Sequence, residues 1–103
     1  MKKQDQAVKK MVAENNELRE QLTKENREYY ENLLAYLRGK SLLRDDYQVE
    51  QNLLTILQDL IDAQADGVDA AAYFGKNPEA IADDLLKTIP LNLTDFFWFN
   101  FEF

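Results

Sequence analysis

The chain contains no histidine and no cysteine, and these two absences exclude much of the chemistry that enzymes use. Histidine is the commonest general base near neutral pH and the commonest ligand of transition metals. Cysteine supplies thiolate nucleophiles, disulfides and zinc ligands. We therefore expect no enzymatic activity, no cofactor and no metal, and we interpret the pairs Asp45–Asp46 and Asp83–Asp84 as helix caps and solvated helix positions.

Glycine and proline are scarce, with 3 and 2 residues among 103, which is typical of helical proteins and not of β-sandwiches. The hydrophobic fraction of 46% is sufficient for one modest core. No run reaches the roughly 18 to 20 apolar residues of a membrane span. The basic start, MKKQDQAVKK, lacks the apolar stretch of a secretory signal, so we expect a cytoplasmic protein.

Positive charge is also in short supply. The sequence has 19 acidic and 12 basic side chains and a net charge of −7. Such a surface repels nucleic-acid phosphates, so we expect no direct binding of DNA or RNA.

Residues 1–22 are predicted to form a long N-terminal helix with a narrow seam. The seam residues follow one another at spacings of three and four: Val8, Met11, Asn15, Leu18 and Leu22. A lone Asn at a seam position fixes the register of two-stranded coiled coils, which favours a homodimer. The pattern covers only two heptads, however, so the seam could equally pack against the chain's own domain.

Residues 23–90 are predicted to form a bundle of helices, which gives an all-α fold of four to five helices in total. Thr23, Asp45 or Asp46, Asp69 and Asn77 are suitable N-caps for successive helices. We expect the helix that follows Thr23 to end at Gly39, and Leu42 and Leu43 in the next connection to lie under the core. The helix over residues 46–65 is the most apolar and is predicted to be central, through one stripe: Val49, Leu53, Ile56, Leu60 and Ala63.

The stretch from Asp66 to Leu86 is rich in residues that end and begin helices. Gly67 and Gly75 are suited to left-handed backbone at helix ends, and Pro78 to the first turn of a helix. We expect Phe74 to fill the gap between the helix over 46–65 and the last helix, which spans residues 78–88.

Residues 91–103 form an aromatic tail, with six aromatic side chains in its last eight positions. We single out Phe97, Trp98 and Phe99 as candidate contact residues. Three interpretations stay open: an extended arm that docks on the domain or on a second copy, an anchor in the lipid headgroup region, or the start of a segment that continues beyond Phe103.

One family resemblance rests on eight residues: Gly67, Tyr73, Phe74, Gly75, Pro78, Ala82, Leu85 and Leu86. With these residues, the chain over about 22–90 resembles the helix-turn-helix-associated alpha-helical signalling domains of bacteria. It also resembles related domain-of-unknown-function families that form the cytoplasmic N-terminal part of small multi-span membrane proteins. The upstream stretch LTKENREYYENLLAYL looks like the first domain helix of this membrane-linked branch. The resemblance implies a signalling role, often beside winged-helix regulators and transmembrane segments, and no enzymatic activity.

The sequence therefore favours a non-enzymatic cytoplasmic signalling or adaptor module that binds a protein, such as a winged-helix transcription regulator. In this interpretation the module lies at the inner face of the membrane, tethered through a continuation beyond Phe103. The alternative is a homo-oligomerisation module built on the N-terminal helix and the aromatic tail.

Overall fold

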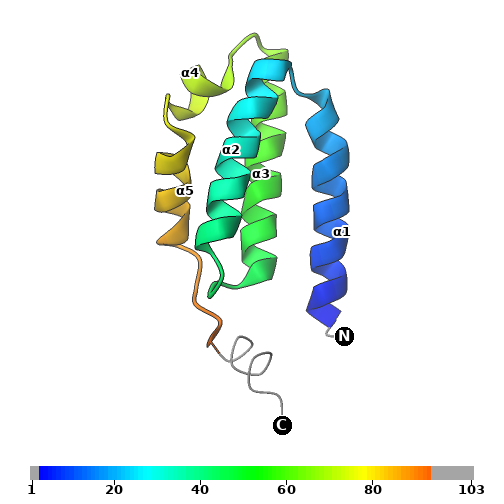
Figure 1. Cartoon of the computed structure of the whole chain (residues 1–103). Coiled ribbons are helices and arrows are strands. Elements are labelled where there is room, and N and C mark those ends of the chain that lie inside the picture. Colours follow the sequence, from blue (N-terminus) through cyan, green and yellow to red (C-terminus); the bar gives the residue numbers. More distant parts are fainter. Residues whose placement is uncertain (1–2, 94–103) are drawn as a thin grey trace.

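Capping side chains set the helix boundaries in the computed structural model, which describes residues 3–93 (Figure 1). Helix α1 (Lys3–Leu18) runs into a short 3-10 helix, η1 (Arg19–Gln21), and extended backbone at Leu22 separates η1 from α2 (Lys24–Lys40). Helices α3 (Asp46–Ala65), α4 (Ala70–Phe74) and α5 (Pro78–Leu86) follow. This confirms the all-α bundle with a long N-terminal helix that the sequence predicts.

Each of the helices α2 to α5 begins at a side-chain cap. Thr23, Asp45, Asp69 and Asn77 accept hydrogen bonds from backbone N–H groups of the first turns of α2, α3, α4 and α5. These bonds satisfy donors that a helix start otherwise leaves without partners. Pro78 occupies the first turn of α5, where a missing N–H removes no helical hydrogen bond.

The helices do not pack in the order in which they follow one another. Helix α3 lies between α1 and α2, and α5 lies on the far side of α2, so the spatial order is α1, α3, α2, α5 (Figure 1). Helices α1 and α3 therefore run in the same direction. The start of α1 and the segment after α5 lie at one end of the bundle, and α4 lies at the other (Figure 1).

The core lies between α2 and α3 and is closed by residues of α1, α4 and α5 and by Leu22 and Ile89. The predicted stripe of α3 is buried along its whole length, from Val49 to Ala63. Tyr30, Leu33 and Leu37 of α2 are fully buried opposite it. This confirms that α3 is central, although it shares that position with α2. None of the helices within residues 3–93 combines the length and the apolar character that crossing a membrane requires.

Helix α2 does not end at Gly39, as the sequence suggests, but includes it. Its last turn is closed by Ser41, whose N–H and hydroxyl both donate to the carbonyl of Arg38. Gly39 keeps helical backbone because a side-chain cap replaces the left-handed turn that a glycine would supply.

The expectation that Leu42 and Leu43 lie under the core is wrong. Leu42 is 76% exposed and Leu43 is 36% exposed. Ile89, which is 1% exposed, closes this end of the core instead. The side chain of Arg44 donates to the carbonyl of Ile89 at 2.9 Å, so the segment after α5 is fixed beneath the bundle and the two leucines point outward.

The glycines allow a direct test of these backbone assignments. Gly75 has φ +104°, where any side chain is strained, whereas Gly39 is helical with open space around the position of a Cβ. We expect Gly75→Ala to lower the free energy of unfolding by about 1–2 kcal/mol. Gly39→Ala is the matched control and should raise it by about 0.5–1 kcal/mol. Urea titration measures both, and equal effects of the two changes would contradict the assignment.

Candidate functional site

The acidic side chains singled out by the sequence are engaged in structural contacts. Asp45 and Asp69 are N-caps, and Asp83 accepts a hydrogen bond from the hydroxyl of Tyr36 at 2.8 Å. This bond raises the pKa of Tyr36. Asp84 pairs with Lys87 at 3.6 Å on an exposed surface. Over residues 3–93, no three acidic side chains converge to hold a metal ion.

The aromatic corner, which we define as Tyr29, Tyr73 and Phe74, is one exposed apolar feature within residues 3–93. Phe74 stacks on Tyr29 of α2 with ring centroids 6.4 Å apart, and Tyr73 meets Phe74 edge-on at 4.7 Å. Phe74 is only partly buried, and Tyr73 is 53% exposed. Phe74 packs against the core and stacks on Tyr29 of α2, and the expectation that it fills the gap between α3 and α5 stays a prediction.

Backbone contacts hold the aromatic corner in place. The hydroxyl of Tyr29 donates to the carbonyl of Gly75 at 2.7 Å, and burial raises the pKa of Tyr29. Gly67 (φ +80°) ends α3 and Gly75 ends α4, so positive-φ glycines bracket the short helix that carries Tyr73 and Phe74. The rings are thus oriented before any partner is present.

A polar network joins the starts of α2 and α4 to the end of α3, at the same end of the bundle as the aromatic corner. The side-chain oxygen of buried Asn26 accepts from the N–H of Ala70 at 2.9 Å, which fixes the first residue of α4. The side-chain amide of Asn26 donates to Gln64 at 2.9 Å, and Gln64 in turn donates to the carbonyl of Gln21. An open depression of about 450 Å³ lies above this network, between the start of α2 and the turn after α3. Asn26 and Gln64 were not identified from the sequence, because nothing in the local pattern marks contacts 38 to 44 residues apart.

The seam residues of α1 face α3 and α2 of the same chain. Asn15 is fully buried and Leu22 is 8% exposed, whereas Val8, Met11 and Leu18 are partly buried. The contact of α1 with α3 is one of the two most extensive helix contacts in the bundle. The seam therefore has an intramolecular partner, as one of the two sequence interpretations expects.

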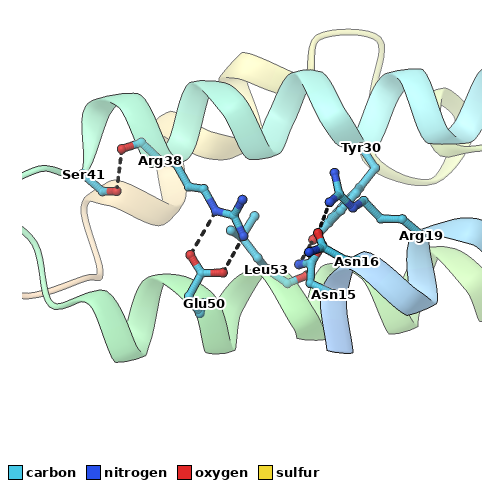
Figure 2. Close-up of polar contacts among 8 residues, drawn as sticks. All are labelled: Asn15, Asn16, Arg19, Tyr30, Arg38, Ser41, Glu50 and Leu53. Atoms are coloured by element: carbon cyan, nitrogen blue, oxygen red, sulfur yellow. Dashed lines mark hydrogen bonds and ion pairs between the residues drawn. The ribbon is translucent and has the colours of Figure 1, made fainter. Parts of the chain in front are cut away.

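Asn15 is held by a buried hydrogen-bond chain through Tyr30 (Figure 2). Asn15 Nδ2 donates to the Tyr30 hydroxyl at 2.6 Å, and that hydroxyl donates to the carbonyl of Leu53 at 3.1 Å. Asn15 Oδ1 is buried and accepts no hydrogen bond from the described residues. Burial raises the pKa of Tyr30 to about 12, although the hydrogen bond from Asn15 opposes this shift.

A bidentate ion pair lies further along the same interface between α2 and α3 (Figure 2). Arg38 Nε and Nη2 donate to the two carboxylate oxygens of Glu50 at 3.0 and 2.7 Å. The Glu50 side chain is 8% exposed and that of Arg38 is 32% exposed. Both oxygens of Glu50 accept hydrogen bonds from Arg38, so this pair holds α2 and α3 together.

The second exposed apolar feature is the leucine end, which we define as Leu42, Leu43, Leu91 and Leu93. Leu91 and Leu93 are 55% and 41% exposed. An isolated antiparallel bridge joins Arg44 to Leu91, with Asn92 N–H donating to Leu43 O at 2.7 Å and Asp45 N–H to Pro90 O at 3.0 Å. The candidate tail residues Phe97, Trp98 and Phe99 lie outside the described residues.

Comparison with known proteins gives no matching family model, no similar curated protein and no similar solved structure. The resemblance of residues 22–90 to helix-turn-helix-associated signalling domains therefore stays a prediction, and the functional argument rests on the two apolar features.

The hydrogen-bond chain through Tyr30 predicts an unequal pair of substitutions. Tyr30→Phe leaves the buried amide of Asn15 without a partner and should lower the free energy of unfolding by about 1–3 kcal/mol. Asn15→Val leaves Tyr30 bonded to Leu53 and should cost less than about 1 kcal/mol. The double variant should then be more stable than Tyr30→Phe alone. Chemical denaturation of the native chain, the two single variants and the double variant measures these free energies. If the losses of the two single variants simply add in the double variant, the hydrogen-bond chain from Asn15 through Tyr30 to Leu53 is contradicted.

The same tyrosine predicts a loss of stability at alkaline pH. Because the pKa of Tyr30 is raised from 10.0 to about 12 by folding, the neutral hydroxyl is favoured in the folded state. Its contribution to stability is complete below pH 10 and is lost as the pH rises from 10 to about 12. The free energy of unfolding of the native chain should therefore fall more steeply over this interval than that of Tyr30→Phe. Parallel pH profiles for the two proteins would exclude this contribution.

Proposed function

We propose that this chain is a non-enzymatic cytoplasmic signalling or adaptor module that binds a protein partner through the aromatic corner. One observation carries the proposal: Tyr73 is 53% exposed and yet is held edge-on against Phe74, which is itself stacked on Tyr29. Tyrosines fixed in this way are typical anchors of protein interfaces, because they bury a large surface and lose little conformational freedom on binding.

The charge around the aromatic corner indicates the kind of protein surface that would fit. Asp66 and Asp69 are exposed in the turn before α4, and Glu79 is exposed in the first turn of α5. Lys76 is also exposed between α4 and α5, so the charge here is acidic on balance and favours a partner with an apolar pocket bordered mainly by basic side chains. The family resemblance adds that this partner would be a winged-helix transcription regulator, which the module binds without contacting nucleic acid.

Membrane placement is part of the same proposal. The resemblance to the N-terminal parts of small membrane proteins supports a position at the inner face of the membrane, with a tether in a continuation beyond Phe103. The alternative is a homo-oligomerisation module. Asn15 no longer supports a coiled coil of α1 in this alternative, because it is bonded to Tyr30 of the same chain. The aromatic tail still allows a dimer.

Site-specific photocrosslinking tests the aromatic corner. A photoreactive phenylalanine derivative at Tyr73 should form one dominant adduct with a protein in cells that encode the chain. The matched control is the same probe at Gln58, which is exposed on α3 and outside the aromatic corner. The adduct at Tyr73 should be lost with Phe74→Ala, provided that the variant keeps its helical circular dichroism. Identical adducts from Tyr73 and Gln58 would mean that the aromatic corner has no dedicated partner.

A further inference from the structure

The two segments of the leucine end are held to each other by backbone hydrogen bonds. Its four side chains come from two segments 45 or more residues apart, which the hydrogen bonds of the Arg44–Leu91 bridge fix side by side. Ile89 already fills the core at this end, so the leucines have no place within the bundle. A fold that fixes exposed leucines outward presents them to something other than its own described residues.

Charge is distributed unequally between the two ends of the bundle. In the half that carries the leucine end, residues 3–10, 35–55 and 81–93, basic side chains slightly outnumber acidic ones. In the other half, residues 11–34 and 56–80, acidic side chains outnumber basic ones by more than two to one. An anionic surface would therefore repel the α4 end and turn the leucine end toward itself.

The sequence beyond the described residues continues from this end. Ten residues follow Leu93, and they include the only tryptophan and five of the six phenylalanines of the chain. Tryptophan and phenylalanine partition into the interfacial region of bilayers, as leucine does on the apolar face of an interfacial element. Asp95 and Glu102 also occur in these ten residues, but their aromatic majority matches the apolar chemistry of the four leucines.

We infer that the leucine end rests on the interfacial region of a lipid bilayer, with Leu42, Leu43, Leu91 and Leu93 in contact with lipid. This rests on the membrane placement in the proposed function and names the surface that meets the membrane. The aromatic corner then points away from the bilayer, toward the cytoplasm. A second copy of the chain is a weaker fit, because four leucines at the tip of a bundle are a small surface beside the roughly 800 Å² per partner of a standard interface.

The absence of native cysteine makes the test direct, because one introduced cysteine can carry an environment-sensitive fluorophore. The full chain is labelled at Leu42→Cys or, as the matched control, at Val68→Cys, which replaces an exposed apolar residue at the opposite end. Each protein is mixed with vesicles of phosphatidylcholine and phosphatidylglycerol. We expect the emission from position 42 to rise several-fold and shift to the blue, and the emission from position 68 to stay that of a fluorophore in water.

Three other results at position 42 would overturn the inference. A blue-shifted emission without vesicles that grows with protein concentration would show that a second copy covers the leucine end. The same emission independent of concentration would show that the chain's own tail covers it. An emission that vesicles leave unchanged would show that the leucine end does not meet lipid, and an intact crosslink at Tyr73 would then leave the proposed protein partner standing.

A pair of substitutions separates the leucines from the aromatic tail. Leu42→Ser with Leu43→Ser keeps the tail and should weaken vesicle binding, measured by co-sedimentation of the full chain, by roughly tenfold or more. Val68→Ser should leave binding within about twofold of the native chain, because that position faces away from the bilayer. Unchanged binding by the double variant would mean that the tail alone carries the affinity, and the inference would fail. The high exposure of Leu42 predicts that the double variant folds, which circular dichroism checks.

Discussion

The hydroxyl of Tyr30 lies in the middle of the core, where it links three helices through hydrogen bonds. Tyr30 belongs to α2, receives a hydrogen bond from Asn15 of α1 and donates one to the backbone of α3. Apolar packing alone would tolerate several rotations of α1 on its neighbours, because hydrophobic contacts are not directional. The buried amide of Asn15 has a single hydrogen-bond partner, so it allows only one rotation of α1. Every other rotation would leave the amide without that partner. The bidentate pair of Arg38 and Glu50 fixes the register of α2 on α3 in the same way.

The features that could be predicted from the sequence are those encoded within one turn of chain. The caps at Thr23, Asp45, Asp69 and Asn77 follow from side chains that bond to N–H groups two or three residues on. The apolar stripe of α3 follows from helical periodicity. The spatial order of the helices could not be predicted, because it depends on contacts such as Asn15–Tyr30 between residues far apart. Leu42 and Leu43 were misplaced for the same reason, since only the return of Ile89 shows that the site beneath them is already filled.

In the candidate site too, local features could be predicted from the sequence and contacts between distant residues could not. Local sequence identifies Gly67, Phe74, Gly75 and Pro78 as a compact turn-rich stretch, and the structure brings them to one end of the bundle. That Tyr73 is the exposed ring and Phe74 the supporting one depends on Tyr29, which lies 44 and 45 residues earlier in the chain. The leucine end likewise could not be predicted from either of its two segments alone. Both surfaces used in the proposals therefore exist only once segments far apart in the chain have packed together.

The Arg44–Leu91 bridge also has a mechanical consequence. The segment that leads to the tail does not leave α5 directly but is first fastened to the connection between α2 and α3 by two backbone hydrogen bonds. A pull on the C-terminal end would load these two bonds, and the contact between Arg44 and Ile89, before it reached α5. A load on the segment after α5 would therefore be shared with the connection between α2 and α3, and α5 would not carry it alone.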